Sequence, residues 1–204
     1  MLNSLRSIVQ EVNSARDLRS ALNIIVKRVR AVMATEVCSA YLRDGTGQYL
    51  LMATEGLHEN AIGNVSLAIG EGLVGHVVAR AEPLNLELAT AHPKYQYFEA
   101  TGEERYASFL GVPIIHQREV LGVLVLQQVE RRRFDEGEEA FMVTMSAQLA
   151  GVIAHAEATG ALEVIGKAAR EAKFKGVAGS PGVAIGTAVV MSPTADLRGV
   201  PYQT

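Results

Sequence analysis

Only one cysteine is present in this sequence, and long hydrophobic runs are absent. Cys38 alone cannot form an intrachain disulfide or a multi-cysteine metal site, and a single thiol fits a reducing cytoplasm. No apolar run approaches the roughly 20 residues that cross a bilayer. The N-terminus also lacks a charged segment followed by an apolar stretch, so no signal peptide is expected. We therefore expect a cytoplasmic protein without a membrane role.

A strong excess of charge of one sign is lacking as well. The 19 Lys and Arg residues nearly balance the 22 Asp and Glu residues, and the formal net charge is -3. The concentrated basic run, Arg131-Arg132-Arg133, is followed at once by Asp135 and Glu136. This order is typical of a solvated loop before the acidic start of a helix. Nucleic-acid binding through bulk charge is therefore not expected.

The hydrophobic residues that are present centre on one stretch. The chain has 204 residues, 49% of them hydrophobic, which suits one ordinary domain with an appendage. Between Ala107 and Gln128, two aliphatic runs flank a polar turn at residues 117–119, which predicts a hairpin. The second run, Val120 to Leu126, is apolar at nearly every position. We expect it to form a strand that is buried on both faces in the middle of a sheet.

Other periodicities place further elements around this hairpin. Two amphipathic helices are expected first, one with an aliphatic stripe from Leu2 to Val12 and one capped by Asp17. The expected elements that follow are strands at 35–43 and 48–54, a short strand at 64–68, a short helix after Glu71, and a long helix from Phe134 to His155. This order indicates an α+β fold.

A long irregular segment interrupts the pattern between Ala81 and Thr101. Pro83 and Pro93 break its periodicity, and aromatic residues gather near Tyr95 and Phe98. A loop of this length inside a compact domain is usually functional or mobile.

No catalytic constellation stands out. The adjacent carboxylates of Glu103 and Glu104 would point about 100° apart on a helix and are interpreted as solvated surface. The glycines at 70, 72 and 75 lack the Lys-Ser/Thr of a phosphate loop, and no Ser, His and Asp form a nucleophile motif. Cys38 is interpreted as a small buried hydrophobe on the first strand.

Four local strings occur where GAF domains carry similar ones. They are E-G-L-V-G-H-V-V at 71–78, A-H-P at 91–93, L-G-V-P-I at 110–114 and L-G-V-L-V-L at 121–126. With the element order, they make residues 1–159 resemble a GAF domain. The resemblance implies a central antiparallel sheet with helices on one face and a crossover helix and loops on the other.

A second resemblance concerns the end of the chain. The string G-V-A-G-S-P-G-V-A-I-G, from Gly176 to Gly186, is similar to the opening of the phosphohistidine region of Enzyme I of the phosphoenolpyruvate:sugar phosphotransferase system. A GAF domain followed by this string resembles the nitrogen-related Enzyme I, a phosphoenolpyruvate-protein phosphotransferase. The resemblance implies a helical linker at 160–175 and the truncated start of the phosphohistidine region at 176–204.

The same resemblance implies that catalysis lies outside this chain. The catalytic histidine of the family belongs to a Thr-Ser-His string, which does not occur here, and none of the five histidines stands in such a context. The chain by itself is therefore expected to be neither an enzyme nor in need of a cofactor or metal. The complete phosphotransferase would use Mg²⁺ and pass its phosphoryl group to a phosphocarrier protein.

A ligand pocket between the sheet and the crossover elements is also implied by the resemblance to GAF domains. The ligand-binding candidates, by motif position, are Ser39, Thr54, Glu55, Leu73, Val74, Leu88, His92, Tyr95 and Val125. His92 and the apolar members could equally serve structural roles. Glutamine and 2-oxoglutarate are the first ligand candidates. A cyclic nucleotide is disfavoured because Gln128 and Val129 replace the Asn-Lys of the domains that bind it.

Three classes of function compete at this point: a metabolite sensor that controls an attached phosphotransferase of nitrogen regulation, a dimerisation module without a physiological ligand, and an independent enzyme. The sensor is favoured, with its ligand state transmitted through the C-terminal helix. A homodimer is expected as well, because the stripe from Leu2 to Val12 and the long last helix need covering and commonly pack as a bundle in GAF domains.

Overall fold

A six-stranded antiparallel sheet forms the middle of the fold in the computed structural model, which describes residues 2–159. Across the sheet the strands are β3 (Ser66–Leu67), β2 (Tyr49–Glu55), β1 (Val37–Arg43), β6 (Glu119–Gln128), β5 (Ser108–His116) and β4 (Leu84–Leu86). The α-helices of these residues are α1 (Leu2–Asn13), α2 (Leu18–Met33), α3 (Gly72–Arg80) and α4 (Glu136–Ala158). The linker expected at 160–175 and the phosphohistidine start expected at 176–204 lie outside the described residues.

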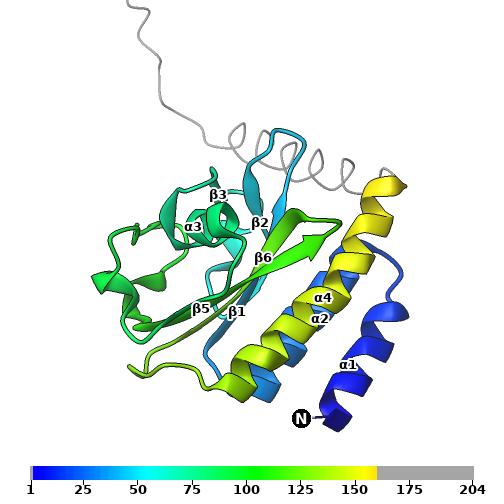
Figure 1. Cartoon of the computed structure of the whole chain (residues 1–204), viewed down its shortest axis with the longest axis horizontal. Coiled ribbons are helices and arrows are strands. Elements are labelled where there is room, and N and C mark those ends of the chain that lie inside the picture. Colours follow the sequence, from blue (N-terminus) through cyan, green and yellow to red (C-terminus); the bar gives the residue numbers. More distant parts are fainter. Residues whose placement is uncertain (1, 160–204) are drawn as a thin grey trace, which may run out of the picture.

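The sheet separates two layers of different character. Helices α2 and α4 lie against one face with α1 packed on them, and α3 with the connecting loops lies against the other face (Figure 1). The predicted α+β architecture, with helices on one face and a crossover helix and loops on the other, is confirmed.

The predicted central hairpin is β5 and β6. Its turn residues Gln117 and Arg118 both have positive φ, 49° and 72°, a backbone conformation that suits a tight hairpin turn. Strand β6 lies between β1 and β5, and its residues from Leu121 to Gln128 are buried. The sequence-based expectation of a two-sided buried strand is therefore confirmed.

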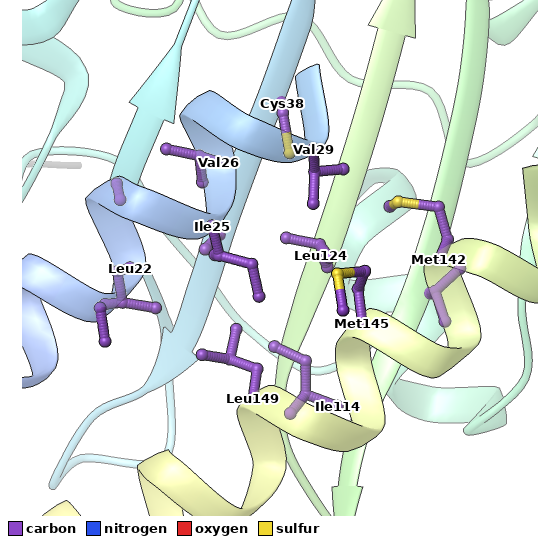
Figure 2. Close-up of a cluster of buried hydrophobic side chains, with 14 of the residues drawn as sticks. Leu22, Ile25, Val26, Val29, Cys38, Ile114, Leu124, Met142, Met145 and Leu149 are labelled. Carbon is purple, nitrogen blue, oxygen red and sulfur yellow. The ribbon is translucent and has the colours of Figure 1, made fainter. Parts of the chain in front are cut away.

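The face covered by helices holds the larger apolar core. Because side chains alternate along a strand, Cys38, Ala40 and Leu42 of β1 point to this face, whereas Val37 and Tyr41 point to the other. Figure 2 shows the meeting of the layers, in which side chains of α2 and α4 converge on those of the sheet strands. Helices α2 and α4, which come from opposite ends of the domain, thus pack against the same face of the sheet and share one core.

Both long helices begin at the caps that their sequences indicate. Asp17 caps α2, because its carboxylate accepts a hydrogen bond of 2.7 Å from the backbone N–H of Ser20. Asp135 caps α4 in a reciprocal capping box with Glu138. Both caps satisfy backbone N–H groups that the first turn of a helix would otherwise leave unpaired.

The irregular segment contains structure that the sequence analysis did not predict. β4 pairs antiparallel with β5 at the edge of the sheet, directly after Pro83. A short 3₁₀ turn, η2 (Ala89–Ala91), lies within the segment, whereas η1 (Glu59–Ala61) precedes it and η3 (Glu103–Arg105) follows it. The adjacent carboxylates at 103 and 104 therefore lie on a 3₁₀ turn at the end of a long loop.

Candidate functional site

A small cavity lies on the loop-covered face, between the sheet, α3 and the segment from Tyr95 to Glu103. Its volume is about 20 Å³, and a water molecule needs roughly 10–15 Å³ measured in this way. The lining residues are Tyr41, Leu67, Leu73, Val74, Tyr95, Gln96, Phe98, Glu103, Phe109, Val125 and Gln127. The walls are mostly apolar and aromatic, and the lining contains no basic residue.

Glu103 supplies the carboxylate of this cavity. Its Oε2 accepts a hydrogen bond of 3.0 Å from Nε2 of Gln127, which lies near the end of β6. The preceding residue, Gly102, has a φ of 64°, and a Cβ there would lie 2.6 Å from the ring of His58. A glycine is therefore needed at the point where the loop turns Glu103 back toward the sheet.

Burial is the main reason that the pKa of Glu103 lies above its ordinary value. Removing a carboxylate from water disfavours its charged form, and hydrogen bonds from Gln127, from the backbone of Phe98 and from Thr101 offset this only in part. In the part of the chain that the structure describes, no ion pair involves this carboxylate. The cavity therefore contains an acceptor group that is incompletely compensated.

Tyr41 adds a hydroxyl group to the same cavity. The side chain comes from β1, only 4% of the residue is exposed, and its hydroxyl makes no hydrogen bond to any described residue. Burial, and then the nearby charge of Glu103, raise the pKa of Tyr41. Burial and Glu103 likewise raise the pKa of Tyr95. The phenols stay neutral donors at physiological pH.

Replacing Glu103 with glutamine is expected to stabilise the chain at neutral pH. Burial raises the pKa of Glu103 in the folded chain above its unfolded value, which is near 4.5. Between these two pKa values the folded chain binds more protons than the unfolded chain. The free energy of unfolding therefore falls as the pH rises through this interval, and it stays reduced at higher pH. Glu103→Gln keeps an oxygen that can accept from Gln127 but removes the charge. Thermal unfolding should show a higher melting temperature for this variant at pH 7 and a smaller difference near pH 4; equal melting temperatures at both pH values would contradict this.

Four of the residues predicted from the sequence line the cavity. Leu73 and Val74 reach it from α3, Tyr95 from the irregular loop, and Val125 from β6. The structure thus brings together predicted residues from distant parts of the chain, and their contact with a ligand stays a prediction.

The other predicted residues do not line the cavity. Ser39 and Thr54 are paired across β1 and β2, with 2.7 Å between Oγ and Oγ1, so each satisfies the other. Glu55, the next residue on β2, forms an ion pair of 3.4 Å with Arg30 of α2. Its side chain is thus directed toward the helical layer.

Two predicted loop residues lie beyond the lining. Leu88 directly precedes η2, and His92 directly follows it. The ring of His92 contacts that of His76 on α3, with 5.1 Å between centroids. Partial burial, then the neighbouring His92 and basic residues, lower the pKa of His76. The ring contact joins the loop to α3, and a ligand-binding role for His92 stays a prediction.

Sequence reasoning missed four polar members of the lining: Tyr41, Gln96, Glu103 and Gln127. A signal existed for Gln127, since it follows Val123 and Val125 at intervals of two along a buried strand and therefore points to the same face. A polar residue at such a position indicates a partner on the same face. For Glu103 the local sequence offers no comparable signal.

Reactive groups are not assembled elsewhere in the described residues. The thiol of Cys38 is fully buried, and burial raises its pKa, so the reactive thiolate is disfavoured. Within residues 2–159 no three or more His, Cys, Asp or Glu side chains are grouped so that they could hold a metal ion. The Mg²⁺ that the resemblance implies for a complete phosphotransferase has no candidate ligands in this region.

Two more open hollows occur on the side of the helices. A groove of about 1020 Å³ lies between the α1–α2 turn and the C-terminal half of α4. A second hollow of about 590 Å³ lies beside the first turns of α4, near Asn85 and Phe134. Both exceed the cavity in volume, but only the cavity combines apolar walls with convergent buried polar groups, which is the usual composition of a small-molecule site.

The sequence and the fold match those of known proteins. The model of the GAF domain family matches residues 17–153, and the chain belongs to this family. A GAF domain from a phosphoenolpyruvate-protein phosphotransferase of Coxiella burnetii is 49% identical, with a TM-score of 0.76; the match covers 79% of this chain and 96% of that one. The corresponding domain from Acinetobacter is 48% identical, with a TM-score of 0.71, and the match covers 78% and 96%.

A longer relative extends the comparison. A protein of Salmonella typhimurium described as "Phosphoenolpyruvate-dependent phosphotransferase system" is 46% identical over 188 residues, which are 92% of this chain and 25% of that protein. The chain thus spans about a quarter of the length of the curated relatives it matches. It is a GAF domain of the type found in phosphoenolpyruvate-protein phosphotransferases. Among residues 2–159, no helix combines the length and the apolar character that crossing a membrane requires.

Proposed function

We propose that this GAF domain senses a small metabolite and controls an attached phosphoenolpyruvate-protein phosphotransferase of the nitrogen phosphotransferase system. The observation that carries the proposal is the cavity, in which Glu103, Gln127 and Tyr41 converge between apolar walls. A carboxylate that is partly withdrawn from water and incompletely compensated is unfavourable for the fold, and a bound partner would compensate it. Glutamine and 2-oxoglutarate remain the first candidates.

A metabolite can occupy this site only if the loop moves. The cavity of about 20 Å³ holds roughly one water molecule, whereas small-molecule sites usually reach roughly 300 Å³ or more. Tyr95, Gln96 and Phe98 lie on a loop segment that contributes to the lining. Ligand binding would displace this segment outward and order it in a second arrangement. The chain would then have two states, which a sensor requires.

The two-sided hairpin offers a physical route from the cavity to α4. Val125 and Gln127 face the cavity, whereas the alternating residues Leu124 and Leu126 face the helical core. A shift of β6 would therefore change the packing against α4, the helix that precedes residues 160–204. Coupling between two sites in proteins is typically worth about 1–3 kcal/mol.

A metabolite panel tests the sensor directly. We expect at least one small polar metabolite to raise the melting temperature of the chain, to release or absorb heat in calorimetry, and to alter hydrogen exchange in residues 95–103 and in α4. The His92→Ala variant is the control. It should respond to the metabolite as the unmodified chain does, because the His92 side chain lies outside the cavity lining. If no member of a wide panel gives heat or a melting shift, the sensor proposal is wrong.

The role of the complete protein follows from the relatives and is part of the proposal. A longer chain would carry the phosphohistidine region, bind Mg²⁺, and transfer a phosphoryl group from phosphoenolpyruvate to a phosphocarrier protein in the cytoplasm. The GAF domain would contribute regulation and no catalytic group, in keeping with the missing Thr-Ser-His string.

A dimerisation role is the second candidate, and the open groove favours it. Ile8 and Val12 of the α1 stripe are already buried in the chain's own helical core, so they do not need a partner to cover them. The groove between the α1–α2 turn and α4 is instead lined by apolar atoms of Ala15 and Val152. A second copy could cover this groove.

Sedimentation tests this candidate, which is compatible with sensing. We expect the unmodified chain to be dimeric at tens of micromolar and Val152→Glu to be monomeric, since a charge in a covered apolar groove is unfavourable. Val143→Glu on the same helix is the matched control, because Val143 is 44% exposed and lies outside the groove. A monomeric unmodified chain would show that the interface is misplaced.

A further inference from the structure

We propose that residues 160–175 of this chain turn back after Thr159 and occupy the groove between the α1–α2 turn and the C-terminal half of α4. The groove has a volume of about 1020 Å³. The inference assigns an occupant to a surface on the helical side of the sheet. It goes beyond the proposed sensing function, because the docking needs no metabolite.

The α4 side of the groove is apolar and uncovered among the described residues. Helix α4 carries no charged residue from Ala140 to Ala154. The outward face of a surface helix normally carries charged or polar side chains, yet Ala147 and Gly151 are exposed and line the groove together with Val152. An exposed apolar surface of this kind is typical of an interaction site.

The chain leaves α4 at the groove itself. Thr159, the last described residue, is one of the lining residues. Its backbone N–H donates to the carbonyl oxygen of His155 at 3.2 Å, and its hydroxyl lies 3.1 Å from the carbonyl oxygens of His155 and Ala156. These contacts close the last turn of α4. Gly160 comes next, and a glycine directly after a helix cap commonly lets the chain change direction.

The sequence that follows has the pattern that such a groove requires. An apolar stripe recurs at intervals of three and four residues, which places its members on one face of a helix. The stripe consists of Leu162, Ile165, Ala169 and Ala172. The charged residues Glu163, Lys167, Arg170 and Glu171 fall on the opposite face of the same helical pattern. One face of this segment can therefore be buried while its charges stay in water.

The lengths of the stripe and the groove agree as well. As a helix, the stripe from Leu162 to Ala172 would extend over about 15 Å, at about 1.5 Å per residue. The groove residues of α4 run from Ala147 to Thr159, which corresponds to about 18 Å of helix. A segment that reverses after Gly160 can thus cover the groove along its length.

The tether favours this segment over a second copy of the chain. Because residues 160–175 are joined to a residue of the groove, their docking is intramolecular, and short flexible linkers give effective concentrations in the millimolar range. A second copy would have to displace the segment. The docked segment would contact α4 and the α1–α2 turn together, so a shift of α4 would reach the region that begins at Gly176.

Engineered cysteine pairs in the whole chain test the docking directly. Under mild oxidation at low micromolar concentration, Val152→Cys with Ile165→Cys should form a disulfide within one chain, as shown by mass spectrometry. Val143→Cys with Ile165→Cys is the matched control, because Val143 lies on α4 outside the groove. The groove pair should react at least about tenfold faster, since docking raises the effective concentration of one thiol beside the other. The native Cys38 is fully buried and does not compete.

Hydrogen exchange gives a second measurement without oxidation. Ile165→Glu places a charge on the apolar stripe and should increase backbone exchange in residues 147–156, because the groove loses its cover. Val164→Glu is the control, since it adds the same charge one position away and off the stripe. Thermal unfolding should confirm that both variants remain folded.

Three results would overturn the proposal. They are equal reaction rates in the two cysteine pairs, a disulfide that forms only between two chains, and unchanged exchange of residues 147–156 in the Ile165→Glu variant. A disulfide between chains would identify a second copy as the occupant. None of these results bears on metabolite sensing, which the ligand panel tests separately.

Discussion

Replacing Gly122 with alanine is expected to lower the free energy of unfolding by about 3 kcal/mol, the upper part of the usual range for overpacking a core. Gly122 lies on β6 and pairs with Leu42 of β1 and Ile114 of β5. A Cβ there would lie 2.3 Å from the backbone oxygen of Tyr41. This atom belongs to the neighbouring strand, so it cannot move aside as a flexible side chain would.

Denaturant and thermal unfolding would measure the effect. A loss of this size lowers the melting temperature by about 6–12 °C in a domain of roughly 150–250 residues. Gly151→Ala is the matched control, because a Cβ at this helical position meets no atom within 4 Å. It should be neutral or stabilising by up to about 1 kcal/mol. If both variants unfold alike, the close approach of β1 and β6 is not the cause.

The sequence allowed the central hairpin and the long helices to be predicted because their signals are local. Along β6 nearly every side chain is apolar, and α4 repeats apolar residues at helical spacing behind the Asp135 cap. These patterns reflect which faces are buried, so they identify both the elements and their layers. The layered α+β architecture could thus be predicted before any contact was known.

β4 could not be predicted in this way. It has three residues, all half-buried, and it follows Pro83 at the edge of the sheet. A strand this short has no measurable periodicity, and its pairing with β5 is a contact between distant parts of the sequence. The three residues of β4 form a strand only because β5 offers a sheet edge with which they can pair.

Four of the nine predicted site residues line the cavity, and most polar members of its lining were not predicted. Thr54 and Glu55 were both placed in the pocket, but adjacent residues on a strand point to opposite faces. The structure accordingly directs Glu55 to Arg30 on the helical side. Which of the two would face the loops depended on the β1–β2 register, which shifts between Ala40 and Tyr41. An irregularity of this kind is not visible in local sequence.

Glu103 shows a different limit of sequence reasoning. Two adjacent carboxylates usually form part of a solvated surface, and Glu104 is exposed as expected. Glu103 is turned inward by the positive φ of Gly102 and held by Gln127, a contact across 24 residues of chain. The role of a charged residue at a loop end is thus decided by a nonlocal partner.

Leu149→Ala is expected to destabilise the chain by about 2–5 kcal/mol, the usual cost of removing a leucine side chain from a core. Leu149 lies on α4, is fully buried, and meets the side chains of α2 and the sheet (Figure 2). The alanine would leave a cavity between the layers that the surrounding backbone can close only in part. Chemical denaturation should show the loss as a lower midpoint with an unchanged slope.

Val143→Ala is the matched control on the same helix. Val143 is 44% exposed, and surface substitutions usually change stability by no more than about 0.5 kcal/mol. A similar loss in both variants would mean that the packing of Leu149 against the sheet is not the cause.

The same variant also tests the proposed route to the output helix. The ligand cavity and Leu149 lie on opposite faces of the sheet, so Leu149→Ala should leave the affinity for a bound metabolite nearly unchanged under conditions in which the variant is folded. Transmission should suffer, because α4 no longer follows β6 through close packing. Ligand-dependent hydrogen exchange in α4 should therefore diminish while that in residues 95–103 persists. If both responses persist in full, the signal leaves the cavity by another path, and α4 serves only to close the core.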